Sequence, residues 1–135
     1  MAKFFISYKF TGENPAELER ILLEISNILK KSGHKVYSAS KDEKLFIEEK
    51  FIAKQILNHA LKEIDNADCI LVFAKSNEKS EGMLIEIGYA LAKKKKIILA
   101  MKEGVNFYFT EDIADKVIEF SDIKDLLIKL EILKI

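Results

Sequence analysis

The chain has 135 residues, enough for one domain with a hydrophobic core, and 22 basic residues balance 22 acidic ones, so its net charge gives no attraction to nucleic acid or to an anionic membrane. The single cysteine, Cys69, excludes an internal disulfide and a cysteine-rich zinc site, and two histidines are too few for most imidazole metal sites. No stretch is long and apolar enough for a signal peptide or a membrane span, so we expect a cytoplasmic protein with no metal, no cofactor, and no membrane or nucleic-acid partner.

Apolar runs alternate with longer stretches of helical periodicity along the chain. The run over residues 4–8 predicts a buried strand, and the helix that follows begins with Asn14 as N-cap and Pro15 as its first residue, and ends at Gly33. The further elements that the pattern predicts are a strand over 35–39, a polar loop over 40–46, one long helix over 47–66, a strand over 69–73, a helix capped by Ser80, strands over 96–101 and 116–120, and a C-terminal helix from 121.

This strand–helix alternation is typical of the α/β class. It predicts one domain over residues 1–135: a three-layer sandwich in which a five-stranded, mostly parallel sheet has helices on both faces. Ligands bind such sheets at the carboxyl ends of the strands, near the point where the strand order reverses. The segment from Ser7 to Gly12, after the first strand, and the segment from Ser80 to Glu86, after the third, are therefore expected to border one pocket.

The first of these segments combines several groups that suit a nucleotide. Lys9 offers a cation, Tyr8 and Phe10 offer aromatic rings, and Gly12 offers flexibility. A cation and aromatic rings can bind an anion and a stacked base. His59, near the end of the long predicted helix, is a further candidate for ligand contact if it faces the same cleft.

Glu86 is the unusual residue of the second segment. It lies among apolar residues of a predicted helix, and no basic residue stands three or four positions away to pair with it. Burial of such a carboxylate is costly unless something else meets it. Ser80 caps the same helix and Gly82 leaves room beside it, so this helix N-terminus is suited to receive a phosphate or a carboxylate.

The pattern around Glu86 resembles a known family. The motif Ser80-x-Gly82-x-x-x-Glu86, continued by Ile87-Gly88-Tyr89-Ala90 and by a strand over 97–99, is similar to the nucleoside 2-deoxyribosyltransferase superfamily, most of all to its 2′-deoxynucleoside 5′-phosphate N-hydrolases. The segment over 64–71 also fits the pattern that these proteins show before the third strand. The resemblance implies a flavodoxin-like (Rossmann-like) sheet, a dimer or higher oligomer, Glu86 as nucleophile and Ser80 as a phosphate contact.

The resemblance predicts a hydrolase that cleaves the N-glycosidic bond of a (deoxy)nucleoside 5′-monophosphate to free base and sugar phosphate. Breaking that bond places positive charge on the sugar, which an adjacent carboxylate stabilises or traps covalently. We expect such an enzyme to form a homodimer. Its expected substrate-binding residues are Ser7, Tyr8, Lys9, Phe10, Gly12, His59, Ser80 and Gly82.

Three alternatives stay open. The first is base exchange by a deoxyribosyltransferase. The second is cleavage of NAD, because the segment over 5–8 is similar to TIR domains, and the third is nucleotide binding without catalysis. Two departures from the family pattern favour the last of these. Phe5 stands where the family usually has a tyrosine that hydrogen-bonds the catalytic acid, and Ala60 stands where it often has an aspartate.

Overall fold

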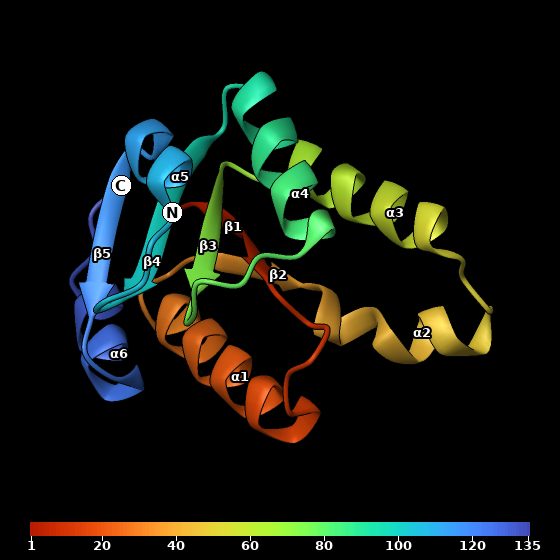
Figure 1. Cartoon of the computed structure of the whole chain (residues 1–135), viewed down its shortest axis with the longest axis horizontal. Coiled ribbons are helices and arrows are strands. Elements are labelled where there is room, and N and C mark those ends of the chain that lie inside the picture. Colours follow the sequence, from red (N-terminus) through yellow and green to blue (C-terminus); the bar gives the residue numbers. More distant parts are fainter.

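The strands form a single five-stranded sheet in which all neighbouring pairs are parallel (Figure 1). A computed structural model describes residues 1–135. The strand order is β2-β1-β3-β4-β5, the order of flavodoxin-like folds, and it reverses between β1 and β3. The strands are β1 Lys3–Tyr8, β2 Lys35–Ser38, β3 Cys69–Ala74, β4 Lys96–Lys102 and β5 Lys116–Phe120.

Helices cover both faces of the sheet and complete three layers, as the sequence predicted (Figure 1). The helices are α1 Pro15–Lys31, the 3-10 helix η1 Ala39–Asp42, α2 Glu43–Glu48, α3 Ala53–Asp65, α4 Glu81–Ala92, α5 Tyr108–Ile113 and α6 Ile123–Glu131. Alternate side chains of each strand point to opposite faces. Phe4 and Ile6 therefore pack with α1 and α6, while Phe5 packs with α3 and α4.

Local signals at the helix ends act as the sequence predicted. The Asn14 side chain accepts a hydrogen bond from the Glu17 amide at 3.0 Å, and Pro15 is the first residue of α1. Gly33 follows α1 with a φ of +90°, a backbone conformation that favours glycine. None of the helices combines the length and the apolar character needed to span a membrane.

The segment between β2 and β3 differs from the prediction of a loop over 40–46 and one helix over 47–66. The chain forms η1 and α2 first, and α3 begins only at Ala53. Lys50 adopts a φ of +53° and ends the first helical segment, and the Gln55 side chain caps the second by accepting from the Ile52 amide at 2.9 Å. The rings of Phe46 and Phe51 stack 5.3 Å apart across the break.

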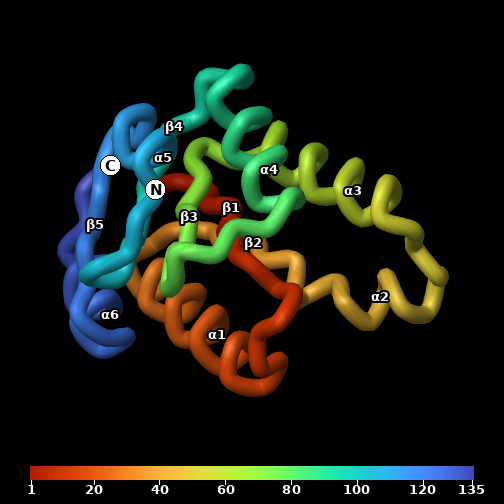
Figure 2. Tube along the Cα trace, viewed as in Figure 1, coloured from red at the N-terminus to blue at the C-terminus, as the bar shows by residue number.

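The break changes what the apolar residues of this region contact. Ile64 is buried, whereas Ile52 and Ile56 are exposed. The trace in Figure 2 shows α2 and the start of α3 extending beyond the edge of the sheet. The apolar side chains of this arm are therefore available to line a cavity or a surface.

Candidate active site

A cavity of about 670 Å³ opens beside the carboxyl end of β1, next to the point where the strand order reverses. Its volume suits one nucleoside-sized ligand, since such sites commonly measure about 300–1,000 Å³. Four regions line it: the end of β1 with its loop, the η1–α2 segment, one face of α3, and the first turns of α4. The lining residues are Phe5, Ile6, Tyr8, Phe10, Thr11, Ala39, Ser40, Glu43, Phe46, Ile47, Ala53, Ile56, Leu57, Ala60, Ser80, Glu81, Gly82, Met83, Ile85 and Glu86.

Glu86 enters this cavity from the second turn of α4. Met83 and Ile87 of the same helix are buried against the sheet, and this register turns Glu86 toward β1. The Ser7 hydroxyl, on β1, donates a hydrogen bond to Glu86 Oε1 at 2.7 Å. None of the ion pairs in the structure involves Glu86.

Burial is the main influence on the ionisation of Glu86. It raises the pKa of this carboxyl from 4.5 to about 7, and the hydrogen bond from Ser7 acts in the opposite direction. Burial disfavours the charged form, whereas a donor to the carboxylate favours it. A carboxyl that ionises near neutral pH inside a cavity is characteristic of catalytic acids, bases and nucleophiles.

Ser7 is the residue of β1 that hydrogen-bonds Glu86. In the family, a tyrosine at the position of Phe5 was expected to make this contact. Phe5 is 1% exposed and stacks on Tyr37 at a ring distance of 5.7 Å. Ser7 is two residues further along, so its side chain leaves the same face of the strand. The polar contact to the carboxylate is therefore present, but another residue makes it.

Ser80 and Gly82 both line the cavity at the start of α4. The Ser80 side chain accepts from the Met83 amide at 3.2 Å and is the N-cap of the helix, as predicted. A Cβ atom at Gly82 would meet nothing within 4 Å, so close packing does not require this glycine.

The residues of the β1–α1 loop are divided between two places. Tyr8 and Phe10 line the cavity, and Phe10 is 49% exposed at its mouth. Burial raises the pKa of Tyr8, to which the nearby carboxylates also contribute. Lys9 and Gly12, both predicted to bind substrate, do not line the cavity.

The Lys9 ammonium is bound by two carboxylates. It lies 3.1 Å from Glu13 Oε2 and 3.0 Å from Glu78 Oε2, and Lys75 binds the other oxygen of Glu13 at 2.6 Å. Gly12 turns the loop with a φ of +82°, and a Cβ atom there would stand 3.3 Å from the Lys9 ammonium. These contacts join the loop that follows β1 to the loop that follows β3. In this structure, Lys9 therefore holds the two loops together and does not face the cavity.

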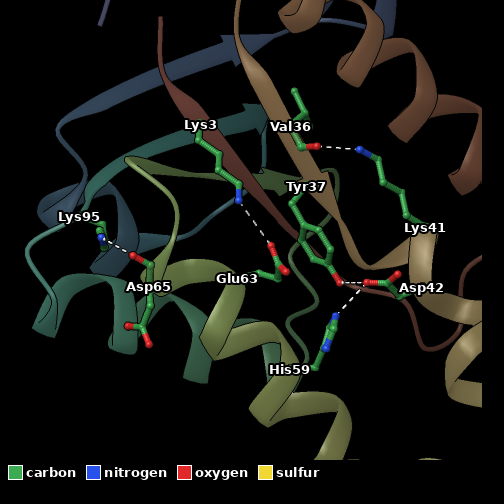
Figure 3. Close-up of polar contacts among 9 residues, drawn as sticks. All are labelled: Lys3, Val36, Tyr37, Lys41, Asp42, His59, Glu63, Asp65 and Lys95. Atoms are coloured by element: carbon green, nitrogen blue, oxygen red, sulfur yellow. Dashed lines mark hydrogen bonds and ion pairs between the residues drawn. The ribbon is translucent and has the colours of Figure 1, made fainter. Parts of the chain in front are cut away.

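His59 lies outside the lining, although its neighbour Ala60 belongs to it. His59 Nε2 lies 2.9 Å from Asp42 Oδ2, to which the Tyr37 hydroxyl also donates at 2.6 Å. Figure 3 shows the His59 and Tyr37 side chains meeting at Asp42. Burial acts to raise the pKa of Asp42, but the hydrogen bonds from Tyr37 and His59 outweigh it and lower the pKa. This group ties η1 to α3, and none of its three residues lines the cavity.

Sequence reasoning did not identify Asp42 as a partner of His59 and Tyr37. It also did not predict that Glu43 and Phe46 line the cavity. Asp42, Glu43 and Phe46 all lie in the segment that was expected to be a polar loop. The Phe46 side chain, inside a charged stretch, was the available signal that this segment packs against something.

The charges of the lining all have one sign. Glu43, Glu81 and Glu86 are carboxylates, and no lysine, arginine or histidine lines the cavity. No group of three or more His, Cys, Asp or Glu side chains in the structure is arranged to hold a metal ion. The cavity is thus apolar, aromatic and acidic.

Comparison with known proteins gives a consistent family and fold. The family model described as nucleoside 2-deoxyribosyltransferase matches residues 9–125. A sequence comparison with curated proteins gave no match.

Solved structures share the fold at low sequence identity. The CMP N-glycosidase of Clostridium botulinum is 22% identical with a TM-score of 0.71, over 96% of this chain and 97% of that one. The 2-deoxyribosyltransferase of Bacillus psychrosaccharolyticus is 18% identical with a TM-score of 0.72, over 98% and 93%. A flavodoxin-like domain from Synechococcus, at 15% identity and a TM-score of 0.52 over 95% and 92%, confirms the predicted fold class.

Proposed function

We propose that this chain, which belongs to the nucleoside 2-deoxyribosyltransferase family, cleaves the N-glycosidic bond of a nucleoside or nucleoside 5′-monophosphate with Glu86 as the nucleophile. The observation that carries the proposal is the 2.7 Å hydrogen bond from Ser7 to Glu86 in a cavity sized for one such ligand. The bond fixes one carboxylate oxygen and leaves the other free to face a sugar.

The reaction uses the negative charge of Glu86. As the C1′–N bond breaks, positive charge develops on the sugar, and the carboxylate attacks C1′ to form a glycosyl ester. A carboxylate in apolar surroundings interacts more strongly with that charge than one in water. Water then attacks C1′, restores the carboxylate and yields the free sugar.

Hydrolysis is the first form of the proposal. The cavity is open to solvent at its mouth, so water can reach the glycosyl ester once the base has left. A CMP N-glycosidase is among the structures that share this fold. Ser80, at the N-terminus of α4, is the proposed contact for a 5′-phosphate in this form.

Base exchange is the second form, and the charge of the cavity favours it. Nucleosides without a 5′-phosphate are the usual substrates of the transferases, and the lining has no cation to bind a phosphate. A second base in the emptied cavity would then attack C1′ in place of water. A 2-deoxyribosyltransferase shares this fold as well.

A panel of nucleosides, nucleoside 5′-monophosphates and NAD tests the proposal, with released base measured by chromatography. Glu86→Gln should lower the rate by about a hundredfold or more, because the shape is kept and the charge is lost. The matched control is Glu103→Gln, since Glu103 is exposed and does not line the cavity. Addition of a second free base separates exchange from hydrolysis. Turnover that survives in Glu86→Gln would contradict the assignment, and no turnover of any compound would favour a binding protein.

We also propose a homodimer, formed through the apolar side chains around the cavity mouth. Ile47 is 70% exposed on α2, and Leu84 and Ile85 are 47% and 46% exposed on α4. Ile52 is exposed between α2 and α3. An apolar surface of this kind, placed beside a site, is typical of a protein interface.

A further inference from the structure

We infer that the preferred substrate carries a positively charged base and no 5′-phosphate, that is, a pyridinium or N7-methylated purinium nucleoside. The inference rests on the proposed function and restricts the class of nucleoside that serves as substrate. Three features of the cavity carry it: the sign of its charges, the engagement of the lysines in the two bordering loops, and the aromatic rings of its wall.

The carboxylates of the cavity come from two separate elements. Glu43 belongs to α2, and Glu81 and Glu86 belong to α4, so a ligand in the cavity has negative charge on two sides. No cationic side chain of the lining offsets them. A positively charged base is attracted by this arrangement, and a doubly charged phosphate is repelled.

The lysines of the two bordering loops are all bound elsewhere. Lys9 pairs with Glu13 and Glu78, and Lys75 pairs with Glu13. Lys79 donates to the carbonyl oxygens of Asn77 and Asn106, both at 3.2 Å. A phosphate would have to break these contacts to obtain a cation.

The helix N-terminus does not make up for this lack. The Ser80 side chain accepts from the Met83 amide and has a single hydroxyl hydrogen to donate, while the next residue, Glu81, places a carboxylate at the same end of the helix. A phosphate bound there would meet that charge at close range.

The wall of the cavity suits a flat cation. The lining contains four aromatic residues: Phe5, Tyr8, Phe10 and Phe46. The face of an aromatic ring attracts a cation, and the attraction increases when the cation leaves water. The same rings can stack with a pyridinium or purinium ring.

A cationic base also leaves without a proton. When Glu86 attacks C1′, the C1′–N electron pair passes to the ring nitrogen, which becomes neutral, and a glycosyl ester forms on Glu86. Water then gives its hydroxyl to C1′, Glu86 departs as the carboxylate, and one proton passes to solvent. A neutral base needs an acid to protonate it, and the position where the family often has an aspartate is Ala60, which offers no proton.

Four probes separate the effects of charge and of phosphate. We would measure kcat/KM from base release with nicotinamide riboside, its 5′-monophosphate, N7-methylguanosine and guanosine. The riboside should exceed its 5′-monophosphate by about tenfold or more, since removal of a close like charge is a change of that order. N7-methylguanosine should likewise exceed guanosine.

Two variants remove the intrinsic reactivity of the probes from the comparison. Glu43→Gln and Glu81→Gln should each reduce the preference for N7-methylguanosine over guanosine, and for the riboside over its 5′-monophosphate, by about threefold to tenfold. Each variant is compared with the wild type on the same pair of substrates, so the chemistry of the leaving group cancels. Glu103→Gln should leave both ratios unchanged, because this exposed carboxylate does not line the cavity.

The outcomes distinguish a failure of this charge preference from a failure of the proposed N-glycosidic cleavage. Efficient base release from guanosine or from 5′-monophosphates, with unchanged ratios in the two variants, would overturn the inference and leave the function standing. If no probe releases base, calorimetry on the wild type decides: tighter binding of N7-methylguanosine than of guanosine supports the charge preference without catalysis. Equal or absent binding would overturn the inference together with the function.

Discussion

Replacement of Glu86 by glutamine should stabilise the fold at alkaline pH while it removes activity. The carboxyl is held by Ser7 in an apolar cavity, and burial raises its pKa from 4.5 to about 7. Glutamine keeps the shape and an oxygen that accepts the Ser7 hydrogen bond, but it never ionises. The variant therefore escapes the unfavourable burial of a charge.

The size and the pH window follow from the two pKa values. Between pH 4.5 and pH 7 the unfolded chain has lost the proton that the folded chain keeps, so the stability of the wild type falls as the pH rises. The loss is small below pH 4.5 and complete above pH 7. At about 1.4 kcal/mol for each unit of pKa difference, the penalty reaches about 3 kcal/mol at pH 8 and about 1 kcal/mol at pH 5.

Urea unfolding at pH 5 and pH 8 measures this difference. The free energy of unfolding of Glu86→Gln, relative to the wild type, should increase by about 2 kcal/mol from the lower to the higher pH. Glu103→Gln should show no such increase, because Glu103 is exposed. A difference between Glu86→Gln and the wild type that stays constant with pH would refute the view that this carboxyl is buried at a cost.

Three further predictions concern other contacts. Ser7→Ala should move the midpoint of the pH–rate profile above that of the wild type, because the lost hydrogen bond favoured the ionised form of Glu86; an unchanged midpoint would mean that Ser7 does not act on the carboxyl. Light scattering should show a dimer for the wild type and a monomer for Leu84→Asp, since Leu84 is exposed on α4 and does not line the cavity; a monomeric wild type would refute the homodimer. His59→Ala should speed amide hydrogen exchange in α2 and leave β3 protected, because the contact with Asp42 is lost; equal exchange in α2 would show that this contact does not hold the arm.

The parts of the fold that depend on local signals were predictable from the sequence. Asn14, Pro15 and Ser80 mark helix starts through contacts within a few residues, and the apolar run over 69–73 is central in the sheet. The break between α2 and α3 was not predictable in this way. It depends on the backbone of Lys50 and on the stacking of two phenylalanine rings, which periodicity does not encode.

The candidate site was predictable in its location and less so in its contacts. The motif around Glu86 and the reversal of strand order both indicated the same edge of the sheet. The contact of Glu86 with Ser7 joins residues 79 positions apart and requires the packing of α4 on β1. Lys9 was expected to meet a ligand, but its partner Glu78 comes from another loop, and only the folded chain brings them together.

A glycosyl group on Glu86 is the intermediate of the proposed reaction, and it can be detected directly. Wild-type protein is mixed with its best substrate, quenched in acid during turnover and digested, and the peptides are weighed by mass spectrometry. We expect a gain of one sugar residue on the peptide that contains Glu86, and no such gain in Glu86→Gln. A sugar attached to another residue, or Glu86→Gln that releases base at the wild-type rate, would contradict the role of Glu86 as nucleophile.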